Sequence, residues 1–255
     1  NEIAQSEAYT GKPLSKYWSH CGLVKINGEK MSKSLGNFVT IREALKKYNY
    51  EVIKYVMFSK HYTSDIDLLD KDYSLAESHL YYFYTTIKNM NEFILKNNGD
   101  KNGESMEDDI SENIIPKFIE LMDDDFNTAA AISELFGIFK YSNGLLKKAN
   151  KKNGQQIANT FAKILSNLTE VYSILGLLTQ DPDEFISDMK NKYLEKLNLS
   201  IDYIQDQINL RAEAKKVKDF EKADNIRSSL DSKGIILNDT PNGVVWDIKA
   251  LYNVE

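Results

Sequence analysis

The chain contains 255 residues with a formal net charge of −6, and 42% of its residues are hydrophobic. This length is sufficient for one or two packed domains, and the small numbers of glycine and proline residues, 12 and 4, exclude a collagen-like or low-complexity protein. No apolar run is long enough to span a membrane, and the single cysteine, Cys21, indicates a reducing, cytoplasmic location. Because the net charge is negative, any contact with nucleic acid must come from a local basic patch.

The first forty residues combine turn-forming residues with short apolar runs. Residues 2–9 are predicted to end a helix, because a glycine and a proline follow them. Residues 22–28 predict a β-hairpin, since an apolar run leads into an Asn-Gly pair. A loop of small and basic residues follows at 30–37, and residues 40–43 form a capping box at the start of the next helix.

From residue 40 the pattern is helical almost to the C-terminus. A second capping box at residues 74–77 is predicted to begin a helix, and residues 97–113 are predicted to form an exposed loop. Apolar residues recur at helical spacing in residues 80–94, 115–122, 132–139 and 157–175. Together these segments predict an antiparallel helix bundle.

The last seventy residues predict a smaller α+β unit, so that the fold class is mainly α. Charged helical segments are expected at residues 183–198 and 200–217, followed by a shorter helix at 219–230. Residues 235–248 alternate apolar and polar residues around a turn at residues 240–243, which predicts a β-hairpin.

The strongest functional motif is the KMSKS loop, residues 30–34, whose sequence is Lys30-Met31-Ser32-Lys33-Ser34. Two ammonium groups three residues apart can follow negative charge on a polyphosphate. The seryl hydroxyls supply hydrogen bonds, and Gly36 lets the backbone approach a ligand closely. An alternative interpretation is a solvated basic turn without a ligand. We predict that this loop binds the phosphates of a nucleotide.

The KMSKS loop resembles the second nucleotide-binding motif of class I aminoacyl-tRNA synthetases. The flanking sequences, NEIAQSEA before it and LGNF after it, are similar to the cysteinyl-tRNA synthetase family in particular. Three downstream segments resemble the same family in the same order, namely residues 122–128 (MDDDFNT), 218–224 (KDFEKAD) and 239–246 (DTPNGVVW). The resemblance therefore covers nearly the whole chain.

The resemblance implies three parts in this chain. Residues 1–72 would be the end of a Rossmann-type catalytic domain, with the KMSKS loop and a stem-contact region. Residues 73–182 would form a helical bundle of the DALR type, and residues 183–255 a small anticodon-binding unit. Since Asn1 is not a methionine, we expect this chain to be the downstream part of a longer protein and to be inactive alone.

The resemblance also implies an activity for the intact protein, which would be a cytoplasmic monomer. It would activate cysteine with ATP and Mg²⁺ and transfer the cysteinyl group to the 3′ end of tRNA(Cys). Lys30 and Lys33 would be the catalytic residues, and ATP would contact the whole loop, Lys30, Met31, Ser32, Lys33 and Ser34.

A zinc ion is a further implication, because the family grips the substrate thiolate with zinc held by two cysteines, a histidine and a glutamate. Glu2 matches that glutamate, and the other three ligands would lie upstream of Asn1. Taken without the resemblance, Glu2 is a carboxylate on a helix face, and one ligand cannot hold zinc.

In the C-terminal unit, Lys215, Phe220, Asp224 and Asp239 match the family's anticodon-contacting positions. Single-stranded bases are read by stacking on aromatic rings and by hydrogen bonds to their edges, which these residue types provide. The family often has arginine at the position of Lys215 and tryptophan at that of Phe220. The alternative interpretation places Phe220 in the core, makes Asp219 a helix N-cap and Asp239 a turn residue.

Other polar residues have simpler interpretations. Cys21 is expected to be an ordinary buried thiol, and His61 to have a structural role. The acidic residues 123–125 are expected to interact with a helix N-terminus rather than to bind a divalent metal. The lysines of residues 140–152 fit a solvated face and an RNA backbone contact equally well.

Two other functions are considered for the chain. One is a non-catalytic tRNA-binding module. The other is a synthetase-related ligase that joins cysteine to a small amine, which has no need of the anticodon-like residues 218–246.

Overall fold

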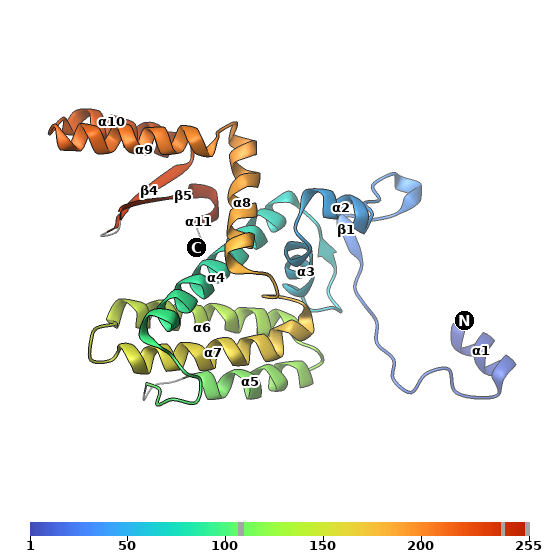
Figure 1. Cartoon of the computed structure of the whole chain (residues 1–255). Coiled ribbons are helices and arrows are strands. Elements are labelled where there is room, and N and C mark those ends of the chain that lie inside the picture. Colours follow the sequence, from blue (N-terminus) through green and yellow to red (C-terminus); the bar gives the residue numbers. More distant parts are fainter. Residues whose placement is uncertain (107–109, 241–242, 253–255) are drawn as a thin grey trace.

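The computed structural model describes residues 1–106, 110–240 and 243–252, and it is mainly α-helical, as predicted. Helix α1 (Glu2–Thr10) lies apart from the rest of the molecule, at the end of an extended segment (Figure 1). Among the described residues, no helix is both long enough and apolar enough to cross a membrane.

A small sheet carries the KMSKS loop. Strands β1 (Val24–Ile26) and β2 (Glu29–Lys30) pair antiparallel, and β3 (Ile66–Asp67) pairs parallel with β1, in the order β2-β1-β3. The predicted hairpin turn is confirmed, because Asn27 and Gly28 adopt left-handed backbone angles with φ of 53° and 80°. The short helix η1 (Lys33–Leu35) and helices α2 (Ile41–Lys47) and α3 (Tyr50–Phe58) follow β2.

The capping box predicted at the start of α2 is present. The backbone N–H of Glu43 donates to Thr40 Oγ1 at 3.1 Å, and the backbone N–H of Thr40 donates to Glu43 Oε2 at 2.9 Å. The second predicted capping box is wrong. Helix α4 (Asp70–Asn97) begins before Ser74, and its first turn is closed by the backbone N–H of Leu69, which donates to Asp72 at 3.2 Å.

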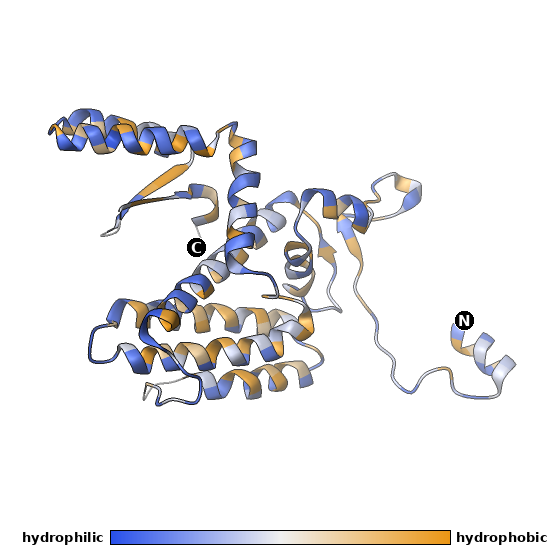
Figure 2. Cartoon of the chain, in the orientation of Figure 1, coloured by the Kyte–Doolittle hydropathy of each residue, from blue (hydrophilic) through white to orange (hydrophobic). Residues whose placement is uncertain are grey.

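Four helices form the bundle, namely α4, α5 (Ser111–Asp123), α6 (Thr128–Lys148) and α7 (Gly154–Leu175). Helices α5, α6 and α7 lie side by side, and α4 crosses from them toward α8 (Figure 1). Figure 2 shows hydrophobic residues along these helices, in keeping with their apolar periodicity. The largest completely buried side chains of the bundle include Phe83, Tyr84, Phe139, Phe161 and Tyr172.

The C-terminal unit begins with α8 (Pro182–Leu197), which packs against α4. Helices α9 (Ile201–Lys216) and α10 (Phe220–Ser232) lie side by side, and strands β4 (Ile235–Thr240) and β5 (Gly243–Ile248) form the predicted hairpin before α11 (Lys249–Tyr252). The register pairs Thr240 with Gly243. Residues 241–242 of the predicted turn lie outside the described residues.

Buried carboxylates join these parts. Glu51 on α3 accepts hydrogen bonds from Tyr84 Oη on α4 at 2.9 Å and from the backbone N–H groups of Leu178 and Thr179 at 3.1 and 2.9 Å. Asp247 on β5 accepts from Tyr81 Oη on α4 at 2.5 Å. Burial, reinforced by the neighbouring carboxylates, raises the pKa of both tyrosines above the ordinary value, so both remain donors at neutral pH.

Candidate nucleotide-binding and nucleic-acid-binding sites

The KMSKS loop is a tight turn held by one side-chain amide. The backbone N–H of Ser32 donates to Asn37 Oδ1 at 2.9 Å, and Asn37 Nδ2 donates to the carbonyl of Lys30 at 3.2 Å. The loop closes at Gly36, whose φ of 68° is the left-handed conformation that glycine adopts without strain. Sequence analysis did not single out Asn37, because its role depends on the folded shape of the loop.

The two lysines of this loop are exposed and carry no carboxylate partner within the described residues. Lys33 Nζ lies 5.8 Å from the centre of the Phe38 ring, which is a weak contact for a solvated cation. Ser32 and Ser34 place their hydroxyl oxygens 3.2 Å apart, and Met31 continues the hairpin by donating its N–H to the carbonyl of Val24 at 2.9 Å. The loop therefore presents cations and hydroxyls that a phosphate chain can contact.

Glu2 is exposed on α1. In the part of the chain that the structure describes, no group of three or more histidine, cysteine, aspartate or glutamate residues is placed to hold a metal ion. A single carboxylate does not meet the four-ligand requirement of zinc, so the described residues do not form a zinc site by themselves. The expectation of a buried thiol is wrong, because Cys21 is exposed.

His61 and Tyr62 bind the connection between α5 and α6. His61 Nε2 lies 3.0 Å from the carbonyl oxygen of Asp125, and Tyr62 Oη donates to Asp125 Oδ1 at 2.8 Å. The structural role expected of His61 is thus supported. The expectation that residues 123–125 cap the next helix is wrong, because they end α5 and enter the connection, and α6 is capped by Asn127, which accepts from the N–H of Ala130 at 3.1 Å.

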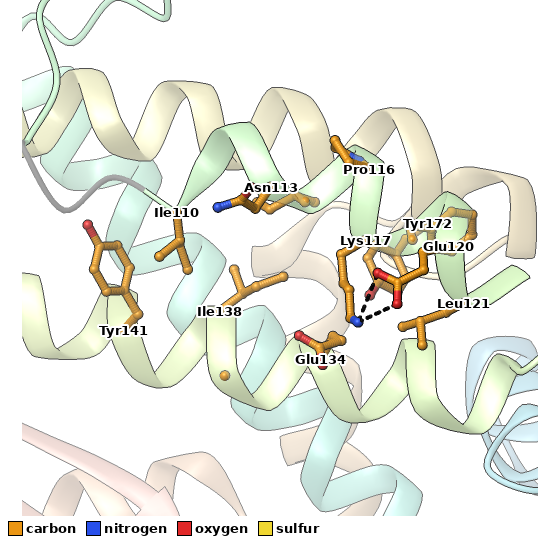
Figure 3. Close-up of a pocket in the computed structure, with 13 residues that line it drawn as sticks. Ile110, Asn113, Pro116, Lys117, Glu120, Leu121, Glu134, Ile138, Tyr141 and Tyr172 are labelled. Atoms are coloured by element: carbon orange, nitrogen blue, oxygen red, sulfur yellow. Dashed lines mark hydrogen bonds and ion pairs between the residues drawn. The ribbon is translucent and has the colours of Figure 1, made fainter.

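A cleft of about 560 Å³ lies between α5 and α6 (Figure 3). Its wall includes apolar side chains and the ion pair of Lys117 with Glu120, in which Nζ lies 3.0 and 3.1 Å from the carboxylate oxygens. None of the predicted site residues lines this cleft. A second cleft, of about 480 Å³, is lined by Cys21, Tyr62 and Phe126 among others.

In the C-terminal unit, Phe220 is the first residue of α10 and 62% of it is exposed. The alternative that placed Phe220 in the core is therefore wrong. Asp219 is the N-cap of α10, since the backbone N–H of Lys222 donates to Asp219 Oδ1 at 3.0 Å. The exposed ring is a surface on which a base can stack, and Asp224 is exposed on the same helix.

Asp239 is held in place by two basic side chains of α9. Arg211 Nη1 and Nη2 donate to its two carboxylate oxygens at 2.8 and 2.9 Å, and Lys215 Nζ lies 3.3 Å from both. The hydrogen bonds from Arg211 hold the pKa of Asp239 well below its usual range, and Lys215 adds to the effect. Asp239 lies within β4, so the alternative of a turn residue is wrong.

Arg211 was not singled out from the sequence. The one local signal is that it precedes Lys215 by four residues, which places both on one face of α9. The lysines of residues 140–152 lie at the end of α6 and in the connection to α7, and Lys140, Lys147, Lys148, Lys151 and Lys152 are exposed. This exposure fits both interpretations of that lysine-rich stretch.

Comparisons with known proteins agree with these features. Residues 1–78 match the family model described as "tRNA synthetases class I (C) catalytic domain", and residues 117–179 match that of the "DALR domain". The chain is 38% identical to the "Cysteine--tRNA ligase" of Geotalea uraniireducens, over 98% of the chain and 52% of that protein. It is 39% identical to that of Geobacter metallireducens, over 98% of the chain and 51% of the relative, and 42% identical to that of Syntrophotalea carbinolica, over 96% and 50%. The chain thus spans about half the length of the curated relatives that it matches.

Proposed function

Since this chain belongs to the cysteine--tRNA ligase family and corresponds to a C-terminal portion of such proteins, we propose that the full-length protein containing it activates cysteine and attaches it to tRNA(Cys). ATP with Mg²⁺ and cysteine would be the small-molecule substrates. The protein would act as a monomer in the cytoplasm. Within it, residues 1–72 would complete the catalytic domain, residues 73–182 would form the helical domain, and residues 183–255 would bind the anticodon.

The observation that carries this proposal is the exposed pair of cations on the KMSKS loop, within residues that match a class I catalytic domain. In the first step a carboxylate oxygen of cysteine attacks the α-phosphorus of ATP in line, and the bond to pyrophosphate breaks. In the second step a ribose hydroxyl of the terminal adenosine attacks the carbonyl carbon, and AMP leaves. Lys33, with Lys30, would stabilise the negative charge on the phosphates during the first step.

The loop is exposed, and the two hydrogen bonds of Asn37 hold its shape. Both features suit a loop that closes over a nucleotide as a unit. Ser32 and Ser34 would donate hydroxyl hydrogen bonds to phosphate oxygens, and the backbone at Met31 would pack beside them. Glu2 would provide one zinc ligand in the full-length protein. The other ligands would have to come from outside the described residues, which do not form a complete site.

We propose that the C-terminal unit reads the anticodon. Phe220 would stack on a base, and Asp224 and Asp239 would accept hydrogen bonds from base amino groups. Lys215 would reach a phosphate or a base edge. The exposure of Phe220 and the fixed orientation of Asp239 support these roles.

Two assays of the full-length protein test the proposal. The first measures ATP–pyrophosphate exchange that depends on cysteine, and the second measures aminoacylation of a tRNA(Cys) transcript with its native or a replaced anticodon. We expect exchange and anticodon-dependent aminoacylation. Exchange without aminoacylation would favour a ligase acting on a small amine, whereas tRNA binding without exchange would favour a non-catalytic module.

A further inference from the structure

Arg211 contacts Asp239, one of the predicted anticodon-reading residues of the C-terminal unit. It lies on α9, its side chain is only 4% exposed, and its guanidinium contacts both carboxylate oxygens of Asp239. Those hydrogen bonds raise the pKa of Arg211 above its ordinary value, and the charge of Asp224 on α10 adds to the effect. The buried guanidinium thus contacts Asp239 directly, which is one of the carboxylates that we assign to base recognition.

The geometry of this pair restricts how Asp239 can move. A bidentate contact between guanidinium and carboxylate fixes both the position and the plane of the carboxylate. The Asp239 side chain is 48% exposed, whereas that of Arg211 is buried, so that a buried guanidinium holds a carboxylate that solvent still reaches. Such an acceptor loses little conformational freedom when a base donates to it.

Lys215 contacts the same carboxylate in a different way. Its ammonium is 3.3 Å from each oxygen of Asp239, at the long end of hydrogen-bond distances, and its side chain is 43% exposed. A carboxylate offers about four acceptor positions, and two of them are taken by Arg211. Lys215 therefore contacts the same carboxylate oxygens that a base amino group would need as acceptors.

We propose that Arg211 is the positioning residue of the anticodon-reading surface, which orients Asp239, and that Lys215 covers Asp239 until RNA displaces it. This inference rests on the anticodon role proposed above. On binding, the ammonium of Lys215 moves to a phosphate, and the uncovered oxygens of Asp239 accept from a base. Arg211 remains in place and does not itself contact RNA.

The test uses the full-length protein and two tRNA transcripts, one with the cysteine anticodon and one with a replaced anticodon, at one fixed salt concentration. The variant Arg211→Lys keeps the positive charge but loses the bidentate contact with Asp239. We expect it to lower the ratio of the two dissociation constants by about tenfold or more, and to change affinity for the replaced anticodon by less than about twofold. Asp231→Asn, which removes an exposed ion pair with Lys249 in the same unit, is the matched control and should leave the ratio unchanged.

A double variant separates positioning from general stability. If Arg211 acts through Asp239, then Arg211→Lys combined with Asp239→Asn should discriminate no worse than Asp239→Asn alone. A further loss in the double variant would overturn the inference, and so would a ratio for Arg211→Lys equal to that of the unmodified protein. If the unmodified protein itself does not discriminate, the proposed anticodon role fails instead.

Lys215→Met tests the covering role without touching the buried residue. Because the cover is removed along with a cation, we expect weaker binding of both transcripts by a similar factor, with their ratio kept or increased. A ratio that falls to one in Lys215→Met, while Arg211→Lys keeps the original ratio, would reverse the roles that we assign to the two residues.

Discussion

The KMSKS loop and the C-terminal unit both present basic side chains, but only the C-terminal unit pairs them with a carboxylate. In the loop, Lys30 and Lys33 are exposed and without a carboxylate partner among the described residues, and a neutral amide of Asn37 holds the turn. In the C-terminal unit, Arg211 and Lys215 are paired with Asp239 before any ligand arrives. The first region presents unpaired cations on an adaptable loop, and the second is preformed, with one carboxylate already paired to its two cations.

This difference matches two kinds of ligand. A polyphosphate brings its own negative charge, so unpaired ammonium groups gain most from meeting it, even though their side chains lose rotamer freedom on binding. A base edge is uncharged and must be recognised by direction, which favours acceptors whose orientation is already fixed. The contrast therefore predicts where substitutions change rates and where they change discrimination.

Lys33→Ala should give the largest effect, because a cation that acts on developing charge contributes mainly in the transition state. We expect the rate of cysteine-dependent ATP–pyrophosphate exchange by the full-length protein to fall by about a hundredfold or more, with cysteine affinity nearly unchanged. Lys46→Ala, at an exposed lysine outside the loop, is the control. Equal losses in rate and in cysteine affinity would contradict a transition-state role.

Much of this contrast was accessible from the sequence, because local patterns determine it. The lysines and serines of the loop, the Asn-Gly turn and the capping box at Thr40 depend on residues within four positions of one another. The exposure of Phe220 also agrees with its functional assignment. Local chemistry of this kind is largely independent of the rest of the fold.

The features that escaped prediction depend on distant residues. Arg211 and Asp239 are 28 positions apart, so their contact depends on the packing of both α9 and β4 against α10. The sequence at Ser74 offers the same capping pattern as that at Thr40, yet α4 starts earlier because Asp72 satisfies the N–H of Leu69 just after β3. Local signals alone do not decide between two competing helix starts.

Glu51→Gln tests the junction that places the loop-bearing sheet on the bundle. The substitution points amide hydrogens at groups that are themselves donors, either the N–H of Leu178 and the hydroxyl of Tyr84, which share Oε2, or the N–H of Thr179 at Oε1. We expect a loss of about 3 kcal/mol in the free energy of unfolding of the chain, measured by urea denaturation. Glu92→Gln, at an exposed residue of α4, should change it by less than about 0.5 kcal/mol. A small loss for Glu51→Gln would mean that the junction does not depend on this carboxylate.

A pH titration of stability should report on the helix bundle rather than on the KMSKS loop or the C-terminal unit. Burial lowers the pKa of His79 to about 4, and its Nδ1 lies 2.8 Å from Tyr55 Oη. In the unfolded chain His79 binds its proton more tightly than in the folded protein. The folded state is therefore most stable above the unfolded pKa of about 6.5, and it loses stability as the pH falls toward 4. Between pH 7 and pH 5 we expect the free energy of unfolding to fall by about 2 kcal/mol.

His79→Gln is the matched variant for this titration, because it keeps a polar side chain but cannot take up the proton. Its unfolding free energy should vary less between pH 7 and pH 5 than that of the unmodified chain. Equal slopes would assign the acid sensitivity to other groups. The paired residues of the C-terminal unit should not contribute in this range, because the pKa of Asp239 is lowered further below it.

Asn37→Ala should produce the smallest of these effects and tests the adaptable character of the loop. The substitution removes the acceptor for the N–H of Ser32 and the donor to the carbonyl of Lys30, but leaves both lysines. A looser turn must lose more freedom when it closes on ATP, so we expect the exchange rate to fall by about tenfold. Asn91→Ala on α4 is the control.

The variant Asn37→Asp distinguishes the two hydrogen bonds of Asn37, because a carboxylate still accepts from the N–H of Ser32 but cannot donate to the carbonyl of Lys30. If the turn must be held in shape before ATP arrives, Asn37→Asp should fall between the unmodified protein and Asn37→Ala in exchange rate. An exchange rate unchanged by either substitution would show that the ligand alone orders the loop. The contrast with the preformed Asp239 cluster would then be sharper, since one region would be shaped entirely by its ligand and the other before its ligand binds.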